Sequence, residues 1–428
     1  MRIVVIGATG LIGSAVTARL LAEGHELVAI GRRTGMARRG LRWVTADLRT
    51  LQRASDWLAN LDGADAVVNC AGVLQDNAHD STAAVHGSSP AALYAACARA
   101  AIKRVVHISA IGVDRQAPTA FSRSKAQGDA ALMASGLDWV VLRPSVVVGR
   151  AAYGGSALFR GLAALPLLPR IAEAGRLQVV QLDDVVATIA YFVRPEVPGR
   201  VQLELAGPDR LTLEEVIALY RAWLGLPAAR QIVVPRWLLA AACWLGDFAG
   251  WLGWRPPLRS TVRRELARGA IGDPGPWRTA TGIAPRSLAQ ALAAEPAAAQ
   301  ERWFSRLYLL KPLMFAILSL FWVFSGLISL GPGWDYCLAL ARQVGIGDVP
   351  APFLILGAAV VDLLVGVGIA IRSTARSALN AALALSMLYL TVATMLLPTL
   401  WIDPLGPLLK IFPVLALTLA AQAILEDR

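Results

Sequence analysis

Short apolar runs alternate with helical patterns along the first 150 residues of the chain. The runs that predict strands are Arg2–Ile6, Glu26–Ile30, Leu41–Thr45, Ala66–Asn69, Arg104–Ile108 and Trp139–Leu142. Helical periodicity separates them, first over Leu11–Ala22. Apolar strands that alternate with helices predict an α/β fold, a Rossmann-type doubly wound parallel sheet. In such sheets ligands bind at the carboxyl ends of the strands.

A different pattern begins near Lys311, where four apolar stretches follow one another. They are Pro312–Leu330, Ala351–Ile371, Ser377–Leu397 and Leu405–Leu425. Each is close to the ~20 residues that a helix needs to cross a bilayer. The sequence therefore predicts an all-α, four-helix transmembrane bundle behind the α/β half.

Charges beside these stretches predict their orientation. Basic residues precede the first stretch and fill the loop after the second: Arg302, Arg306, Lys311, Arg372 and Arg376. The loops on the other side carry Asp335, Asp348 and Asp403 with only Arg342. By the positive-inside rule we expect a multi-pass protein of the inner membrane, with both termini and the α/β half in the cytoplasm. Two charged residues fall inside the stretches, Asp362 and Lys410, and we expect each to face protein or a polar pocket. A structural pair between them is favoured over a quinone- or proton-handling role.

The middle of the chain predicts a lobe and a bridge. Residues 1–207 are expected to form the Rossmann domain with a small α/β lobe from Ala151 onward, residues 208–305 a helical extension, and residues 306–428 the membrane domain. The extension carries apolar residues at spacings of three and four: Trp237, Ala241, Trp244, Phe248 and Trp251. Tryptophan prefers the head-group zone of a bilayer, so an interfacial helix is the first expectation. Burial of this face against the α/β half is the alternative.

The composition of the chain indicates which kinds of partner it binds. The chain of 428 residues has 56% hydrophobic residues and a formal charge of +11. Basic residues beside apolar spans suit anionic lipid head groups, and no nucleic-acid-binding motif is present, so a lipid bilayer and no nucleic acid is expected. The four cysteines lie far apart, and His79 and His86 fall in a polar loop without the spacing of metal ligands. Free thiols in a reducing compartment and no metal site are therefore expected, and the N-terminus lacks the features of a signal peptide.

A glycine-rich loop follows the first predicted strand and opens the first predicted helix. It reads Gly7-Ala-Thr-Gly10-Leu-Ile-Gly13. Glycines there let the backbone approach a pyrophosphate, and the helix N-terminus stabilises that anion. The residues expected to contact the cofactor are Gly7, Thr9, Gly10, Leu11, Ile12 and Gly13.

The end of the second predicted strand indicates which dinucleotide is bound. Arg32 and Arg33 stand there, where an NAD site usually has an acidic residue for the ribose hydroxyls. Two arginines suit a 2′-phosphate instead. The alternative interpretation is that both arginines belong to a basic loop that is exposed to solvent. NADP(H) is therefore favoured over NAD(H) as the cofactor.

Several further motifs make this half resemble the short-chain dehydrogenase/reductase superfamily, in its extended and atypical branch. It is especially similar to the group that contains the nucleotide-binding accessory subunit of respiratory complex I. The matching segments are Ala46-Asp47-Leu48, Asn69-Cys-Ala71-Gly72, His107-Ile-Ser109, Leu142-Arg-Pro144 and Gln181-Leu-Asp183-Asp184. The resemblance implies that Asp47 and Leu48 contact adenine, that Asn69, Ala71 and Gly72 lie beside the cofactor, and that Ser109 is the catalytic serine.

One departure limits what the resemblance implies. The superfamily uses a tyrosine and a lysine four residues later for acid–base chemistry. Here the matching residues are Phe121 and Lys125. Lys125 keeps the role of holding the nicotinamide ribose, but phenylalanine has no proton to exchange. Either Tyr153, in the loop after the Arg-Pro turn, replaces it, or NADP(H) is held without ordinary carbonyl chemistry.

The C-terminal bundle resembles the DoxX-like membrane domain, chiefly at Ser325-Gly-Leu-Ile-Ser-Leu330, and this resemblance implies a link to quinones and redox processes. The sequence thus supports three hypotheses. The first is a redox protein that acts on a membrane-soluble quinone or isoprenoid. The others are an accessory or assembly protein of a membrane protein complex with structural NADP(H), and a sensor of the NADPH/NADP+ ratio.

Overall fold

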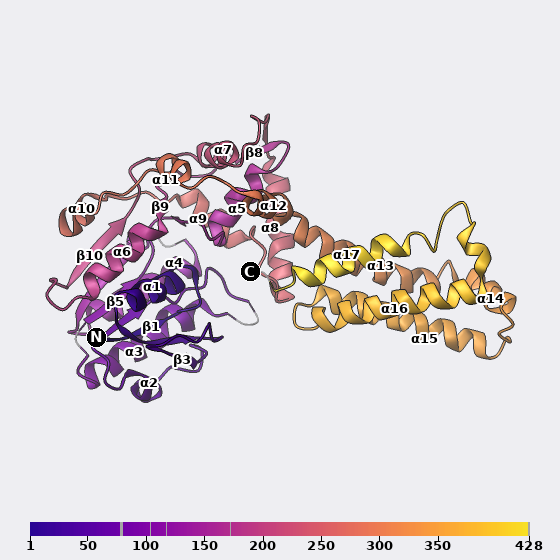
Figure 1. Ribbon diagram of the computed structural model, residues 1–428, viewed down its shortest axis with the longest axis horizontal. Helices are drawn as coiled ribbons and strands as arrows, with labels where there is room; N and C mark the ends of the chain where they lie inside the picture. Colours follow the sequence, from indigo (N-terminus) through magenta and orange to yellow (C-terminus); the bar gives the residue numbers. More distant parts are fainter. Residues whose placement is uncertain (78–79, 103, 117, 172, 427–428) are drawn as a thin grey trace. The chain divides into compact units, whose positions relative to one another are not determined.

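The computed structural model describes residues 1–77, 80–102, 104–116, 118–171 and 173–426 (Figure 1). The chain folds as two compact units. We call Met1–Asp247 with Pro257–Arg306 the N-terminal unit, and Phe248–Pro256 with Leu307–Arg428 the C-terminal unit. His79 lies outside the described residues.

A seven-stranded parallel sheet forms the centre of the N-terminal unit, in the order β10-β6-β5-β4-β1-β2-β3. Its strands are β1 (Arg2–Ile6), β2 (Glu26–Gly31), β3 (Leu41–Thr45), β4 (Ala66–Asn69), β5 (Arg104–Ile108), β6 (Asp138–Pro144) and β10 (Val201–Leu205). All six strands expected from the sequence are present, and β10 is an addition. The chain winds outward from β1 to β3 and then returns to β4 on the other side of β1, pairing Ile6 with Ile30 and with Asn69. This reversal is where doubly wound sheets bind their ligands.

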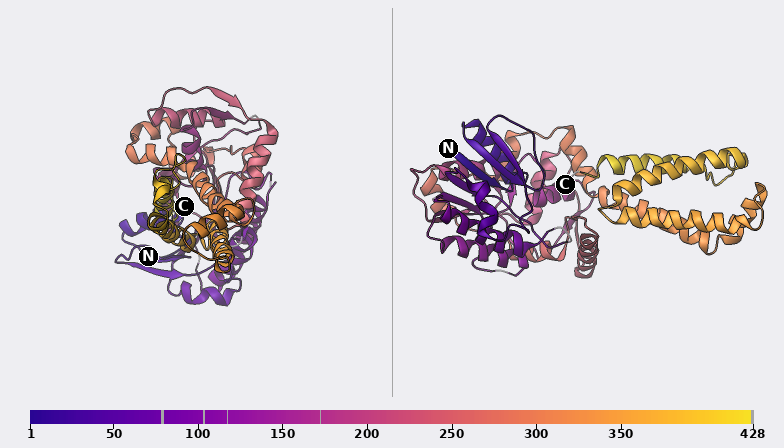
Figure 2. Two further views of the ribbon diagram at one scale, coloured as in Figure 1. Left: turned by 90° about the vertical axis from the view of Figure 1, so that its right-hand side faces the viewer. Right: turned by 90° about the horizontal axis from the view of Figure 1, so that it is seen from below.

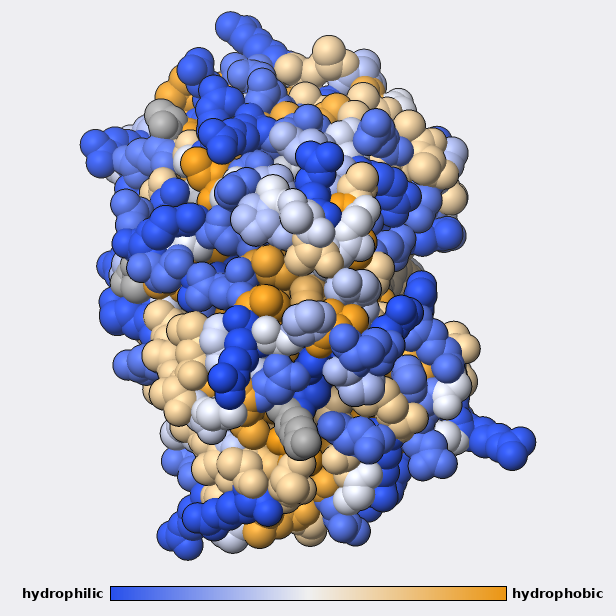
Figure 3. Space-filling view, turned by 90° about the vertical axis from the view of Figure 1, so that its left-hand side faces the viewer, coloured by the Kyte–Doolittle hydropathy of each residue, from blue (hydrophilic) through white to orange (hydrophobic). Residues whose placement is uncertain are grey.

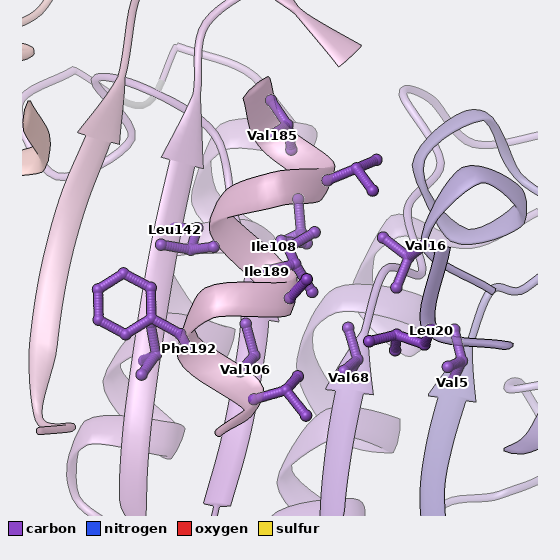
Figure 4. Packing of buried hydrophobic residues seen from close by; sticks show 14 of the residues in the cluster. Val5, Val16, Leu20, Val68, Val106, Ile108, Leu142, Val185, Ile189 and Phe192 are labelled. Carbon is purple, nitrogen blue, oxygen red and sulfur yellow. The ribbon is translucent and has the colours of Figure 1, made fainter. Parts of the chain in front are cut away.

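Helices cover both faces of this sheet, which explains why its central strands β1, β2 and β4 are mostly apolar. The helices are α1 (Leu11–Ala22), α2 (Ala54–Leu61), α3 (Ser89–Arg99), α4 (Ala120–Met133) and α6 (Leu182–Val193). On one face, α1 and α6 supply side chains such as Val16, Leu20, Ile189 and Phe192 to the core over Val68 (Figure 4). On the other face, α2 and α3 pack Trp57 and Leu93 against the strands. The two cores fix the strand ends that carry the candidate site.

A smaller lobe and its extension complete the N-terminal unit. Their elements are β7 (Val147–Val148), α5 (Gly154–Ala163), β8 (Leu168–Arg170), β9 (Val180–Gln181), α7 (Leu213–Trp223), β11 (Gln231–Val233), α9 (Ser260–Arg268), α10 (Gly275–Thr281) and α11 (Leu288–Ala294). Phe159, Leu213 and Tyr220 belong to their common core. Two helices join the units: α8 (Arg236–Trp251) and α12 (Ala299–Tyr308). The face of the molecule in Figure 3 carries mostly hydrophilic residues with apolar patches between them, as expected of a water-exposed surface (Figure 3).

The C-terminal unit is a bundle of helices that run side by side (Figures 1 and 2). Its elements are α13 (Leu310–Leu330), α14 (Trp334–Gln343), α15 (Pro350–Ala370), α16 (Ala375–Leu396), the 3₁₀ turn η2 (Pro398–Trp401) and α17 (Ile411–Ala423). Three of them, α13, α15 and α16, are long and apolar enough to cross a membrane. The fourth expected stretch differs: α17 has 13 residues, about 20 Å at 1.5 Å per residue, which is shorter than the ~30 Å core of a bilayer.

The expected pair between Asp362 and Lys410 is wrong. Asp362 is 4% exposed, and its two carboxylate oxygens accept hydrogen bonds from Ser325 on α13 (2.7 Å) and Tyr389 on α16 (2.8 Å). Lys410 is exposed at the N-cap of α17 rather than one turn inside a span. Pro404, Gly406 and Pro407 stand just before it, and such residues delay the start of a helix.

Candidate functional site

The glycine-rich loop is held by two close backbone approaches. Gly7 has φ +74°, and a Cβ on it would lie 2.8 Å from the nitrogen of Ala71. A Cβ on Gly13 would lie 2.2 Å from the carbonyl oxygen of Gly7. Only glycine therefore fits at either position, and the loop packs directly against the end of β4.

The N-terminus of α1 suits an anion. Gly10 is its N-cap, and no side chain of the described residues caps this end. The first N–H groups of a helix have no partner within it, and its dipole favours negative charge. Leu11 and Ile12 are partly exposed at this end of the helix. The side chain of Thr9 lies close to Gly31, the last residue of β2, because a Cβ on Gly31 would be 3.2 Å from the Thr9 hydroxyl. A pyrophosphate fits this end of the sheet.

Arg32 and Arg33 follow β2 at the same edge, and both are exposed. The guanidinium of Arg32 donates to the carboxylate of Asp80 at 2.5 Å. Asp80 is itself buried, and Asn77 donates to its other oxygen at 2.9 Å. The Arg32 side chain is thus held by the segment between β4 and α3, a tether that sequence reasoning missed because Asp80 lies 48 residues away.

Asp47 and Leu48 stand just after β3. The Asp47 carboxylate accepts two hydrogen bonds from the Arg49 guanidinium, at 2.9 and 2.7 Å, and these bonds lower its pKa. Leu48 packs against the core under β1 and β4. At the adjacent edge, the side-chain oxygen of Asn69 accepts from the nitrogen of Ala71 at 3.1 Å, fixing the turn at the end of β4.

Lys125 reaches that turn from α4. Its ammonium group donates to the carbonyl oxygens of Ile108 (2.7 Å) and Ala71 (3.3 Å). A Cβ on Gly72 would lie 3.7 Å from the Lys125 nitrogen. The side chain is 4% exposed, and burial lowers the pKa of Lys125 to about 8.

Phe121 lies one helical turn before Lys125, with its ring edge-to-face on His86 at 5.5 Å. His86 is buried in a short π-helix, η1 (Ala84–Ser88), and not in a polar loop as expected. Its Nε2 accepts from the nitrogen of Val73 at 3.1 Å, so the proton is on Nδ1, which lies 2.9 Å from the Ser124 hydroxyl. Burial lowers the pKa of His86 well below its ordinary value. Phe121 therefore packs against a neutral imidazole.

Ser109 lies at the end of β5 and donates to Asp129 on α4 at 2.9 Å. The same Asp129 oxygen accepts from Arg143 at 2.8 and 3.0 Å, and the other oxygen is 3.4 Å from Nε2 of His107. Burial opposes ionisation of Asp129, but His107, Ser109 and Arg143 together lower the pKa of this carboxyl. The serine hydroxyl is thus oriented by a buried anion. Sequence reasoning missed Asp129, although its place four residues after Lys125 puts both on one helix face.

Tyr153 is the N-cap of α5, and its side chain is 38% exposed. None of the described contacts joins it to Ser109 or Lys125. Ser109, Lys125, Asn69, Ala71, Gly72 and the glycine loop converge on the strand ends at β1, β4 and β5, whereas Tyr153 belongs to the smaller lobe.

Two family models match the chain. A model for NAD(P)H-binding proteins matches residues 7–160, which contain the glycine loop and the Lys125 segment. A model for the DoxX-like family matches residues 319–419. The chain joins an NAD(P)H-binding domain to a C-terminal DoxX-like domain. The three span-length helices in this part of the chain suggest a lipid bilayer environment.

Known relatives match the NAD(P)H-binding domain over part of their length. An uncharacterized protein of Mycobacterium tuberculosis is 30% identical over 236 residues, which cover 54% of this chain and 25% of that protein. The chain thus spans about a quarter of the length of the curated relatives that it matches first. A ceramide reductase of Caulobacter vibrioides is 26% identical over 219 residues, covering 50% of this chain and 68% of the reductase.

Solved structures support the fold of the NAD(P)H-binding domain. MoeE5 in complex with UDP-glucose and NAD has a TM-score of 0.54 at 18% identity, covering 72% of this chain and 100% of that chain. WbmG of Bordetella bronchiseptica in complex with NAD has a TM-score of 0.52 at 18% identity, covering 69% and 93%. At these identities the likeness concerns the fold alone.

Proposed function

We propose that the chain is a membrane-anchored, NADP(H)-dependent oxidoreductase that acts on a carbonyl or quinone group of a membrane-soluble substrate. The observation that carries this proposal is the presence of an NAD(P)H-binding domain and three span-length apolar helices in one polypeptide. A substrate dissolved in the bilayer and a cofactor dissolved in the cytoplasm then meet at one protein. The chain would be a multi-pass protein of the inner membrane with both termini in the cytoplasm.

The cofactor would be held by the groups gathered at the strand ends. The α1 N-terminus and the loop from Gly7 to Gly13 would bind the pyrophosphate, and Arg32 and Arg33 would bind a 2′-phosphate. Asp80 supports this role for Arg32, because its buried carboxylate keeps the guanidinium beside the end of β2. Lys125 would bind the nicotinamide ribose. The choice of NADP(H) rests on the two arginines.

The chemistry divides between the cofactor and the chain. NADP(H), when bound, supplies or accepts a hydride. Reduction of a carbonyl also requires one proton at the substrate oxygen, and the chain must supply it. Lys125 suits this task because a base whose pKa lies near the working pH exchanges protons readily. Tyr153 is the second candidate donor, and the Ser109 hydroxyl would orient the substrate oxygen.

The substrate class follows from the bilayer and from one relative. Quinones and isoprenoids are apolar molecules that partition into membranes. The relative named ceramide reductase acts, by its name, on a long-chain lipid. Besides quinones and isoprenoids, the proposed substrates of this chain therefore include lipids with a carbonyl group.

One specific observation favours a second function. Phe121 and His86 fill the usual acid position with an apolar contact and a neutral imidazole. Such a site suits a tightly held, structural NADP(H) in an accessory protein of a membrane complex, or a sensor of the NADPH/NADP+ ratio. Neither would need a proton donor.

The decisive experiment is turnover by the full chain in lipid nanodiscs. NADPH oxidation would be followed with a short-chain ubiquinone and with a long-chain keto lipid, and co-purified molecules would be identified by mass spectrometry. We expect turnover with at least one substrate, abolished by Lys125→Met. Turnover by Tyr153→Phe tests whether Tyr153 is the proton donor. Tyr191→Phe is the matched control because Tyr191 packs on Phe192 away from the site. Tightly retained nucleotide that no acceptor oxidises would support the accessory function and overturn the first.

A further inference from the structure

Helix α8 has an apolar face that is exposed along most of its length. Every residue of α8 that is exposed after Arg236 is apolar: Trp237, Leu238, Ala240, Ala241, Trp244, Leu245, Phe248 and Trp251. The three tryptophan side chains are 72%, 66% and 74% exposed. Exposure of so many large apolar groups on one face is unusual for a helix in water.

The opposite face of α8 is packed, so the helix cannot rotate to bury its tryptophans. Leu239 and Cys243 are buried, and a Cβ on Gly246 would lie 1.9 Å from the carbonyl oxygen of Leu258. Asp247 accepts from the Arg259 guanidinium at 2.9 Å and from the Ser260 hydroxyl. The alternative, that the tryptophan face is buried against the nucleotide-binding half, is therefore wrong.

The segment that continues α8 is fixed to the end of a span. The carbonyl oxygen of Leu252 accepts from the nitrogen of Arg372 at 3.0 Å. The Trp254 indole donates to the carbonyl oxygen of Ala370 at 2.6 Å, and the Arg372 guanidinium lies 5.5 Å from the same ring. Ala370 is the last residue of α15. Because the apolar core of a bilayer ends where an apolar span ends, Leu252 and Trp254 mark the level of the membrane surface.

We propose that the exposed face of α8 lies in the interface of the lipid bilayer. Trp251 lies one residue before the segment that is fixed at the surface level. Trp244 is seven residues farther back, about 10 Å along the helix axis. Tryptophan prefers the head-group zone, and helices with one apolar face lie in that zone. The occupant is lipid, because the same polypeptide crosses the bilayer at the end of this segment. The proposal does not depend on the oxidoreductase function.

Spin labelling of the full chain in nanodiscs tests this proposal. A nitroxide would replace Trp244 through Trp244→Cys in a chain whose four native cysteines are changed to alanine and which still binds NADPH. Leu58→Cys, on α2, is the water-exposed control, and Leu364→Cys, a lipid-facing position on α15, is the control inside the bilayer. The accessibility of each label to oxygen and to a water-soluble nickel chelate gives its depth. We expect the label at position 244 to fall between the two controls.

Three outcomes would overturn the proposal. In the first, the label at position 244 is as accessible to the nickel chelate as the label at position 58. In the second, the label at position 244 is as deep in the bilayer as the label at position 364. The third is a label shielded from both reagents in a way that depends on protein concentration, which would assign the face to a second copy of the chain. If the cysteine-free chain does not fold, brominated lipids provide the second measurement. Quenching of the native protein's tryptophan fluorescence should then fall when Trp237, Trp244 and Trp251 become phenylalanine, but not in Trp43→Phe.

Discussion

The hydroxyl of Ser109 donates a hydrogen bond to the carboxylate of Asp129, 20 residues later, at 2.9 Å. The same carboxylate is 1% exposed and pairs with Arg143. This arrangement gives the serine one fixed orientation at the end of β5. It also means that the serine depends on a buried ion pair for its geometry.

Loss of the Asp129 charge should therefore destabilise the N-terminal unit. Breaking a buried ion pair from one side costs about 3–5 kcal/mol, because Asp129→Asn leaves the buried Arg143 paired only with the half-exposed Asp114. We expect a fall of roughly 10 °C in Tm, measured by thermal unfolding in detergent. Asp138→Asn is the control, since its partner Arg104 also donates to the carbonyl oxygens of Phe192 and Val197. Equal losses in the two variants would contradict the role given to Asp129.

Lys125 should make stability depend on pH in the alkaline range. Burial lowers its pKa from 10.5 to about 8. Between these values the unfolded chain binds a proton that the folded chain does not, so the stability of the folded state rises with pH. Relative to Lys125→Met, the wild type should gain up to about 3 kcal/mol between pH 8 and 10.5. Lys410→Met is the control because that side chain is exposed. If the difference in stability between the wild type and Lys125→Met stays constant over this pH range, the lowered pKa of Lys125 is ruled out.

Arg32 and Arg33 should discriminate between the two dinucleotides. The double variant Arg32→Ala with Arg33→Ala removes two donors to a 2′-phosphate, and bonds to charged groups contribute about 1.5–3 kcal/mol each. NADPH affinity should fall by a factor of at least about 100, whereas NADH affinity should change little. Fluorescence titration measures both affinities. Arg38→Ala with Arg39→Ala is the matched control in the same basic segment. If NADPH and NADH weaken equally, the preference for NADP(H) is wrong.

Gly13→Ala should abolish dinucleotide binding. The added methyl would meet the Gly7 carbonyl oxygen at 2.2 Å, so the loop must move away from β4. Gly87→Ala is the matched control, because its methyl would meet only the end of the Gln127 side chain at 3.6 Å. Isothermal titration with NADPH should detect binding in the control only. Binding by Gly13→Ala at wild-type affinity would mean that this loop does not hold the phosphates.

Asp362 should stabilise the C-terminal unit and Lys410 should not. Asp362→Ala removes the acceptor for Ser325 and Tyr389, and hydrogen bonds between membrane helices contribute on average about 0.6 kcal/mol each. A loss of about 1 kcal/mol is therefore expected in reversible unfolding of the full chain in mixed micelles. Lys410→Ala should unfold like the wild type. A comparable loss in Lys410→Ala would restore the pair that the sequence suggested.

The sequence by itself determined the elements that depend on local pattern. The six strands, the helix Leu11–Ala22 and the three long spans appear close to their expected bounds, because strand and helix periodicity and hydropathy are properties of neighbouring residues. The glycine-rich loop could also be predicted from the sequence, since its strand, turn and helix are consecutive along the chain.

Tertiary structure decided which side chains meet. Asp80 reached Arg32, Asp129 reached Ser109, and Tyr389 reached Asp362 from positions 48, 20 and 27 residues away. These distances along the chain carry no local signal, because the partner of a buried charge is set by how strands and helices pack. Packing also decided which face of α8 stays exposed, since the closely approached Gly246 allows only one orientation of that helix.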